Sequence, residues 1–315
     1  MGKYSRRDFL KTSSSGAIAA AALGKHLRTI APRPHIKFPV HPRQRISVAS
    51  YPFRDFIEGR HDSGQASKQP LMKINDFGAM VVQKFHINNI EPWSAHFRST
   101  DPAYVAELRA AFVKAGAQVI NIPADIKHSV YDPDPAMRSA AIEEGKAWVD
   151  VAAMLGSPSV RIHMAEVPNV KPDVDRAGDS MRQIAEYGAI KNVVVNMEND
   201  DLVSEDAFFV VQVIEKANNS YLHALPDFAN SMMSLDADFN YRAVKAMFGR
   251  AYNISHVKEG EDGPNGKFVP VDVGKTFGIA KAAGYRGYFS MEMDRQGDPY
   301  AGTQKLIDLT LKNLA

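Results

Sequence analysis

Four residues that can bind a divalent cation recur along the second half of the sequence. They are Glu198, Asp227, His256 and Glu292, separated by 29, 29 and 36 residues. Each lies at or near the end of a short apolar or β-branched run, so we expect them at the ends of four successive strands. Alone, each would be explained as well by a helix N-cap, a surface charge or a core histidine. Their recurrence at equivalent positions predicts one shared site.

The residue types in this set indicate which cation the site would hold. Three carboxylates and one imidazole, without sulfur, suit Mn²⁺, Mg²⁺ or Co²⁺ better than a structural zinc site, with Zn²⁺ as a further alternative. Three carboxylates buried together without a cation would be strongly unfavourable. We therefore predict a divalent metal cofactor, with Mn²⁺ as first choice.

Other polar residues near expected strand ends are candidates for substrate binding. Arg161 and His163 are two positions apart at the end of one strand, so both could face the site. Alternatively, one of them points outward toward a helix. Lys258 lies two residues beyond the candidate histidine and would polarise a carbonyl, grip a carboxylate or lie in a solvated loop. Glu91 closes an earlier strand, close to Trp93, and is either a ligand for sugar hydroxyls or a rim carboxylate.

The elements that must position these residues alternate regularly along the chain. Short apolar or β-branched runs predict strands at 46–50, 88–91, 118–122, 159–163, 192–198, 221–227, 252–257 and 286–292. Longer segments of helical period predict helices near 70–86, 102–115, 137–155, 175–189, 204–217, 237–248, 273–283 and 300–313. Glycines just past four of these helices are typical of helix C-termini: Gly116, Gly156, Gly188 and Gly284.

Eight strand–helix units without an internal linker predict an α/β fold, a closed (β/α)8 TIM barrel over residues 45–315. The competing doubly wound sheet would need a phosphate-gripping glycine loop after its first strand. Residues 51–56 follow that strand here, and no GxGxxG motif occurs. In a barrel, strand C-termini form the site, and the loops 51–69 and 258–270 are long enough to cover it.

The N-terminal segment has the layout of an export signal. Two adjacent arginines in SRRDFLK (residues 5–11) precede a small, apolar run at 16–23. This run is too short and too weakly apolar to span a bilayer. We predict residues 1–44 to be a twin-arginine signal peptide followed by a Pro-rich basic tether, and the protein to be exported by the twin-arginine machinery to the periplasm or another extracytoplasmic space. The alternative is a simple amphipathic N-terminal helix.

Charge and cysteine content narrow the classes of partner and site. Residues 1–45 hold ten of the 38 lysines and arginines and one of the 36 acidic residues, which leaves 28 basic against 35 acidic residues in the rest of the chain. This acidic body argues against a nucleic-acid partner, which needs a basic stripe. The chain has no cysteine, so disulfides and thiolate metal sites are excluded.

Four motifs resemble the metal-ligand motifs of the sugar phosphate isomerase/epimerase family, the xylose isomerase-like TIM barrels. They are VNMEND at 195–200, LPDFAN at 225–230, ISHVKE at 254–259 and GYFSME at 287–292. The resemblance extends over residues 45–315, and the motifs keep the family's order and approximate spacing. It is specific for fold and metal and much less so for substrate.

The resemblance implies roles for these residues. Glu198, Asp227, His256 and Glu292 would ligate the metal, and Glu198 and Glu292 would also form an acid–base pair flanking a substrate carbon. Such a pair exchanges a proton at the carbon next to a carbonyl, while the cation stabilises the negative charge that develops on the oxygen.

The sequence departs from the family's free-ketose epimerases at two positions. Those enzymes resemble one another in having a histidine and an arginine that bind the ketose. At the corresponding positions this sequence has Asn230 and Asp262. Asn230 remains a candidate substrate ligand, but different oxygens would be held. The loop at 259–266 is acidic and glycine-rich, which disfavours a phosphate dianion nearby.

Three functional hypotheses follow. The first is a metal-dependent isomerase or epimerase acting on a non-phosphorylated sugar or polyol. The second is a lyase or dehydratase that acts on 3-keto-glycosides or inososes by β-elimination with the same groups. The third is a non-catalytic sugar-binding protein, which would have little reason to keep both glutamates around a cation. An AP-endonuclease-like phosphodiesterase is disfavoured because it would need more histidines and a basic face.

Overall fold

The computed structural model describes residues 33–59, 71–232, 236–262, 267–295 and 297–315. Of the two units into which the chain divides, the second, Arg33–Ala315, contains all the described residues. The predicted signal peptide therefore lies almost wholly outside the described residues, as does much of the loop predicted at 51–69.

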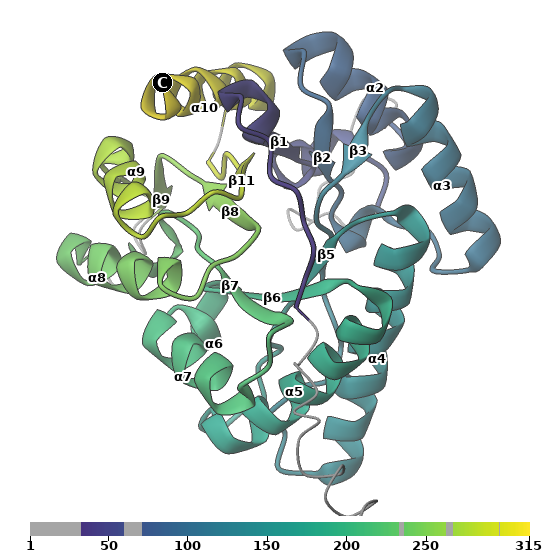
Figure 1. The fold of residues 1–315 in the computed structure, drawn as a ribbon, viewed down its shortest axis with the longest axis vertical. Helices are drawn as coiled ribbons and strands as arrows, with labels where there is room; N and C mark the ends of the chain where they lie inside the picture. The colour runs from purple at the N-terminus through teal and green to yellow at the C-terminus, as the bar shows by residue number, and fades with distance from the viewer. Residues whose placement is uncertain (1–32, 60–70, 233–235, 263–266, 296) are drawn as a thin grey trace, which may run out of the picture. The chain divides into compact units, whose positions relative to one another are not determined.

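Parallel strands form the inner layer of the second unit, with helices around them (Figure 1). The strands are β1 (Ile46–Ala49), β2 (Asn89–Glu91), β3 (Gln118–Val119), β4 (Pro123–Ala124), β5 (Ser159–Ile162), β6 (Val194–Glu198), β7 (Leu222–Leu225), β8 (Ile254–Val257) and β11 (Tyr288–Met291). They bond in two sheets of order β3-β2-β1-β11-β8 and β4-β5-β6-β7. Together they make the predicted α/β TIM barrel.

The third strand position of the barrel differs from the prediction of one strand at 118–122. The chain there divides into β3, which pairs with β2, and β4, which pairs with β5. Between them, the Ile120 amide donates to Ile90 and the Ile122 carbonyl accepts from Arg161. The backbone thus turns from one neighbour to the other, and Pro123, which lacks an N–H, begins the second half.

The two sheets meet again between β7 and β8, where pairing is reduced to isolated bridges. Ala224 pairs with Ala251, and Asp227 pairs with His256. The His256 amide donates to the Pro226 carbonyl at 3.0 Å. These contacts close the barrel beside the strand ends that carry the candidate ligands.

Eight helices of ten or more residues lie in the described part of the chain. They are α2 (Ile74–Phe85), α3 (Pro102–Lys114), α4 (Pro135–Leu155), α5 (Val174–Lys191), α7 (Ala207–Ala217), α8 (Ala237–Phe248), α9 (Val273–Ala282) and α10 (Pro299–Leu314). An aspartate side chain accepts a backbone N–H at the start of six of them: Asp134, Asp173, Asp206, Asp236, Asp272 and Asp298.

The glycines predicted to end helices behave differently at one position. Gly116, Gly156 and Gly284 have positive φ at helix ends, as expected. Gly188 instead lies inside α5, which continues to Lys191 and ends at Asn192 in the left-handed conformation. A Cβ at Gly188 would lie 2.5 Å from the Val193 carbonyl oxygen, so close packing explains this glycine.

Short elements complete the unit. They are α6 (Asp201–Ser204) and the 3-10 helices η1 (Pro42–Arg45), η2 (Tyr51–Phe56), η3 (Ser94–His96) and η4 (Asn230–Met232). The loop predicted at 258–270 contains an antiparallel hairpin of β9 (Gly260–Asp262) and β10 (Phe268–Pro270).

Residues preceding β1 pack against the end of the barrel opposite the strand C-termini. The Phe38 ring contacts those of Tyr252 and Tyr288, and the Tyr252 hydroxyl donates to the Pro34 carbonyl at 2.9 Å. The Arg45 guanidinium donates to the Gly287 carbonyl. In Figure 1 the segment crosses in front of the strands.

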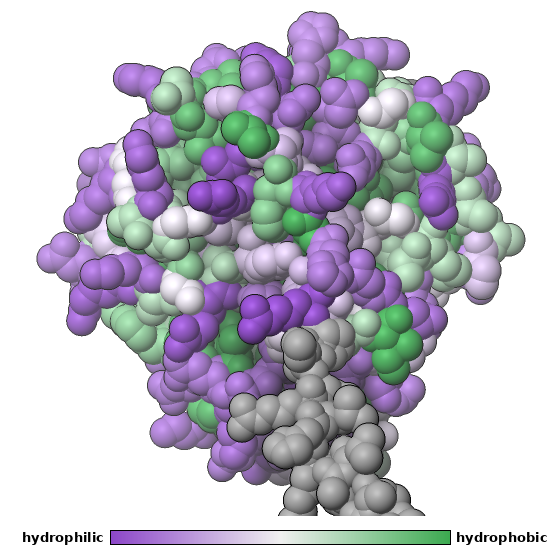
Figure 2. All heavy atoms as spheres, in the orientation of Figure 1, coloured by the Kyte–Doolittle hydropathy of each residue, from purple (hydrophilic) through white to green (hydrophobic). Residues whose placement is uncertain are grey.

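On the face drawn in Figure 2, hydrophobic residues lie singly or in small groups among hydrophilic ones. None of the helices in the described residues combines the length and apolarity needed to cross a bilayer.

Candidate metal centre and pocket

The four residues predicted as metal ligands come together at the C-terminal ends of their strands. Glu198 ends β6, Asp227 follows β7, His256 lies in β8 and Glu292 follows β11. Each offers one ligand atom, and these atoms all lie within 4.8 Å of one another. All four side chains are buried. This group could hold a metal ion.

Asp227 provides the clearest test of whether the group suits a cation. Its Oδ1 accepts the backbone N–H groups of Ala229 and Asn230 at 2.8 and 2.7 Å, which fixes the side chain. Its Oδ2 is buried and accepts no hydrogen bond from the described residues. Burial raises the pKa of Asp227 to about 7 against the opposing charge of Lys258. A buried oxygen without a donor, aimed into a carboxylate cluster, fits a cation ligand.

His256 presents its two ring nitrogens to different partners. Nδ1 lies 2.6 Å from Glu198 Oε1 and 3.2 Å from Glu292 Oε2, so it faces the ligand group. Nε2 lies 3.1 Å from both carboxylate oxygens of Glu91. Although burial opposes it, the charges of these three glutamates raise the pKa of His256 well above its ordinary value.

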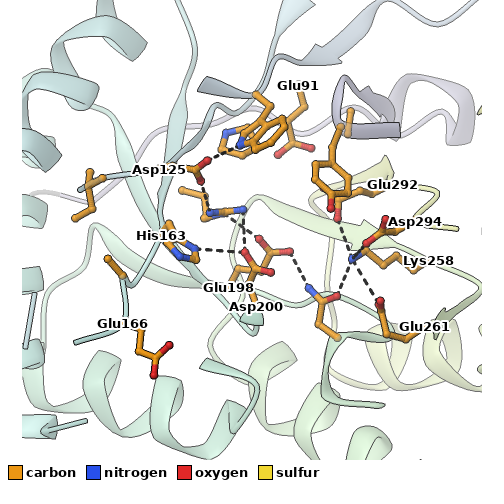
Figure 3. Close-up of a pocket in the computed structure, with 18 residues that line it drawn as sticks. Glu91, Asp125, His163, Glu166, Glu198, Asp200, Lys258, Glu261, Glu292 and Asp294 are labelled. Atoms are coloured by element: carbon orange, nitrogen blue, oxygen red, sulfur yellow. Dashed lines mark hydrogen bonds and ion pairs between the residues drawn. The ribbon is translucent and has the colours of Figure 1, made fainter. Parts of the chain in front are cut away.

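The structure places Glu91 behind this histidine. The sequence allowed either a sugar ligand or a rim carboxylate, but the side chain is fully buried. Asn121 Nδ2 donates to Glu91 Oε1 at 2.7 Å. One edge of Glu91 still reaches the pocket wall, above the centre in Figure 3. Its closest partners are thus protein groups, and the rim reading is wrong.

Arg161 points into the pocket, and its guanidinium is surrounded by carboxylates. Nε lies 2.9 Å from Glu198 Oε2, and the terminal nitrogens lie 3.2 Å from Asp200 and 3.5 Å from Asp125. Against the effect of burial, these charges raise the pKa of Arg161 above its ordinary value. Arg161 therefore orients Glu198, whatever contact it makes with a substrate.

His163, predicted beside Arg161, also faces the pocket (Figure 3). Its Nδ1 lies 3.5 Å from Asp200 Oδ2. Although burial opposes it, the hydrogen bond from His163 and the charge of Arg161 lower the pKa of Asp200. Both members of the alternating pair therefore point inward, and the outward alternative is wrong.

Lys258 is a buried cation on the other side of the ligand group. Its Nζ donates to Asn230 Oδ1 at 2.6 Å and lies 3.4 Å from Glu292 Oε2. Asn230 Nδ2 in turn donates to Glu198 Oε1 at 3.5 Å. Although burial opposes it, Asp227 and the other nearby carboxylates raise the pKa of Lys258 well above its ordinary value. The solvated-loop alternative for this lysine is wrong.

These groups line a pocket of about 450 Å³ at the barrel mouth. One wall is aromatic, because the rings of Tyr51 and Trp93 meet edge to face at 5.2 Å. Its acidic lining residues are Glu91, Asp125, Glu166, Glu198, Asp200, Glu261, Glu292 and Asp294. Arg161 and Lys258 are its permanently charged cations.

Sequence reasoning missed several lining residues. Asp200 and Asp294 each lie two residues beyond a predicted ligand glutamate, so strand alternation was a usable signal for both. No such signal marked Tyr51 in η2, Asp125 after β4 or Glu261 in the hairpin, because none of them lies two residues beyond a predicted ligand. Burial raises the pKa of Glu261 to about 7.

Asp262, which departs from the ketose epimerase pattern, is the last residue of β9 and is exposed. It is not among the residues that line the pocket. Asn230, the other departure, lies inside it. Of the two departures, only Asn230 is therefore placed among the residues that line the pocket.

Comparison with known proteins agrees with this architecture. The family described as xylose isomerase-like TIM barrel matches residues 73–313. D-allulose 3-epimerase from Methylomonas sp. has a TM-score of 0.66 and 15% identity, over 88% of this chain and 100% of that one. 3-Keto-D-glucoside 4-epimerase from E. coli has a TM-score of 0.60 and 15% identity, over 85% and 98%.

A third solved structure, L-ribulose 3-epimerase, has a TM-score of 0.64 and 16% identity, over 86% of this chain and 95% of that one. At such identities the likeness concerns the fold. Among proteins of curated function, none matches this sequence significantly.

Proposed function

The chain belongs to the xylose isomerase-like TIM barrel family, and from that premise we propose that it is a divalent-metal-dependent sugar isomerase or epimerase. Its substrate would be a non-phosphorylated sugar or polyol, and the reaction a proton transfer at the carbon next to a carbonyl. The observation that carries the proposal is the buried group of Glu198, Asp227, His256 and Glu292, with ligand atoms within 4.8 Å.

These four residues would hold the cation, for which Mn²⁺ is the first choice, with Mg²⁺, Co²⁺ or Zn²⁺ as alternatives. When bound, such a cation supplies Lewis acidity that stabilises negative charge developing on a substrate oxygen. Asp227 Oδ2 and His256 Nδ1 would bind the cation and take no part in the proposed proton transfer.

Glu198 and Glu292 are the proposed acid–base pair. They come from separate strands, and each has its own cationic neighbour: Arg161 beside Glu198, and Lys258 beside Glu292. Arg161 restrains one carboxylate, and Lys258 orients the other. A carbon held between them could lose a proton to one glutamate and regain it from the other, which inverts its configuration.

The charge of the pocket supports an uncharged substrate. Eight acidic side chains line it, and both permanently charged cations already contact protein carboxylates. A phosphate or other dianion would meet repulsion with no unengaged cation to bind it among these lining residues. The aromatic wall of Tyr51 and Trp93 suits the apolar face of a sugar.

A β-eliminating lyase or dehydratase is the second candidate, and Asn230 favours it. The amide oxygen of Asn230 binds Lys258, and its nitrogen faces Glu198. The family's epimerases bind a free ketose with the residue at this position, whereas Asn230 contacts other side chains of the protein. With a 3-keto-glycoside, a glutamate would take the proton from carbon two, a C1–C2 double bond would form, and the anomeric oxygen would leave with the bonding electrons and take up a proton.

Deuterium exchange tests the proposed function and separates these reactions. The purified protein with Mn²⁺ is incubated in D₂O with free ketoses, inososes and 3-keto-glucosides, and the Mn²⁺ is removed before proton NMR. We expect deuterium beside the carbonyl of at least one substrate, and a rate at least about 100-fold lower in Glu198→Gln. Glu143→Gln, an exposed position on α4, should keep the wild-type rate.

The products then decide between the candidates. An epimer or isomer supports the first proposal, and a released aglycone or a dehydrated product supports the second. If no panel member exchanges while Mn²⁺ is bound, the isomerase proposal fails in favour of a sugar-binding protein.

We also propose that the chain is exported by the twin-arginine machinery, on the strength of Arg6, Arg7 and the small, apolar run at 16–23. Replacing both arginines with lysine should abolish accumulation of the protein outside the cytoplasm. Equal extracytoplasmic amounts of the double variant and the wild type would refute export by this route.

A further inference from the structure

A buried carboxylate lies directly behind the candidate metal ligand His256. Glu91, which ends β2, and His256, in β8, are both fully buried. Both oxygens of Glu91 lie 3.1 Å from His256 Nε2, while Nδ1 faces Glu198 and Glu292. The ring is therefore held between one carboxylate on its outer side and the ligand group on its inner side.

A chain of buried polar side chains continues from Glu91 through the barrel interior. Asn196 donates to Asn253 at 3.1 Å, Asn253 to the Ser159 hydroxyl at 2.8 Å, and that hydroxyl to Asn121 Oδ1 at 2.6 Å. Asn121 then donates to Glu91 Oε1 at 2.7 Å. These amides and the hydroxyl are fully buried. The three amide nitrogens donate in the direction of Glu91, and the Ser159 hydroxyl also lies 2.9 Å from the Ile120 carbonyl oxygen.

This direction decides which atoms can donate at the histidine. Because Asn121 uses its amide nitrogen on Glu91, the carboxylate is an acceptor at that contact, and its oxygens are placed to accept from the ring as well. The nitrogen facing Glu91 must then carry a hydrogen. In a neutral imidazole this leaves the lone pair on the other nitrogen, which faces the ligand group.

We infer that Glu91 is a positioning residue that holds the proton of His256 on Nε2 and turns the Nδ1 lone pair toward the metal centre. The inference rests on the metal site of the proposed function and is independent of the sugar reaction. It also explains why strand β2, which supplies none of the four ligands, ends in a buried glutamate. In other metal sites, mutating a partner of this kind typically lowers metal affinity by about 10–100-fold.

The first test uses the wild-type protein, with histidine labelled by ¹⁵N and the diamagnetic ion Zn²⁺ bound. Long-range proton–nitrogen correlation NMR distinguishes protonated from metal-bound ring nitrogens, and His256→Gln identifies the signals of this ring. We expect His256 to carry its proton on Nε2 and to bind Zn²⁺ through Nδ1. Zn²⁺ bound through Nε2 would overturn the inference without any variant of Glu91.

The second test compares two carboxylate–histidine pairs. Glu91→Gln is nearly isosteric, and we expect its Mn²⁺ affinity to fall about 10–100-fold and the His256 signals to lose their single-tautomer pattern. The matched control is Glu144→Gln, because Glu144 lies 2.7 Å from His128 Nδ1 and neither residue lines the pocket. That variant should keep both wild-type affinity and the wild-type His256 spectrum.

The outcomes separate this inference from the proposed function. Wild-type Mn²⁺ affinity and unchanged His256 signals in folded Glu91→Gln would overturn the role of Glu91 and leave the metal centre standing. Failure of the wild-type protein to bind Mn²⁺ or Zn²⁺ would overturn the metal centre itself, and the inference with it.

Discussion

The two ends of the barrel are built on opposite principles. At the strand C-termini, carboxylates, Arg161 and Lys258 are buried together around a polar pocket. At the other end, Ile36 and Phe38 pack against an apolar cluster formed by Ile120, Leu225, Ile254 and Tyr288.

Charges buried at the mouth tend to oppose folding, because each must be compensated by a neighbour, whereas apolar burial favours it. Substitutions at the two ends should therefore affect different properties. Changes at the mouth should alter ligand binding more than stability unless they leave a charge unpaired, and changes at the far end should do the reverse.

The largest effect is expected from Asp227→Asn. The asparagine oxygen can still accept the backbone N–H groups of Ala229 and Asn230, but a negatively charged ligand is lost. Mn²⁺ affinity, measured by titration calorimetry, should fall more than about 100-fold, beyond the loss typical of residues that only orient ligands. The melting temperature in EDTA should not decrease, because one buried negative charge is gone. Wild-type affinity in this variant would refute the four-residue site.

Lys258→Met is expected to have the next largest effect. Lys258 Nζ lies within 4.0 Å of Asp227, Glu261, Glu292 and Asp294. Its loss leaves these carboxylates without a nearby ammonium, and the free energy of unfolding of the metal-free protein should fall by about 3 kcal/mol.

Urea denaturation measures this loss, and Lys146→Met is the control. Lys146 pairs with the exposed Glu143, so its removal should cost less than about 1 kcal/mol. Equal losses in the two variants would show that burial adds nothing to the role of Lys258.

Phe38→Ala tests the far end of the barrel. The variant loses the ring contacts with Tyr252 and Tyr288, so the free energy of unfolding should fall by about 1–2 kcal/mol. Mn²⁺ affinity should stay at the wild-type value, because no ligand or supporting residue is touched. A parallel loss of affinity would mean that the two ends are coupled.

The smallest effect is a pH dependence at Glu261. Burial raises the pKa of Glu261 to about 7 from an ordinary value of 4.5, so the folded state favours its protonated form. Its contribution is fully present below pH 4.5 and is lost as pH rises through 7. In EDTA, Glu261→Gln should match the wild type below pH 4.5, and its free energy of unfolding should exceed that of the wild type at pH 8. A constant difference from pH 5 to 8 would contradict the assignment.

The barrel and the ligand group could be predicted because both depend on local patterns. Period-two and helical runs mark the elements, and equivalent strand ends in a barrel meet at one mouth. Spacing alone therefore predicts that Glu198, Asp227, His256 and Glu292 meet in one site.

The supporting contacts could not be predicted, because they depend on which strands are neighbours and on how deep each side chain lies. The pairing of Glu91 with His256 joins residues 165 positions apart. The division of the third strand into β3 and β4 arises from bonding to two different neighbours, which a single run of apolar residues does not reveal.

The four candidate ligands are divided between the two sheets of the barrel. Glu198 and Asp227 end or follow strands of one sheet, whereas His256 and Glu292 belong to the other, and only isolated bridges join β7 to β8. An ion bound by all four would cross-link the two halves where backbone bonding is sparse. Such an ion would stabilise this junction, so hydrogen exchange of the amides along it should slow on metal binding and would report occupancy independently of turnover.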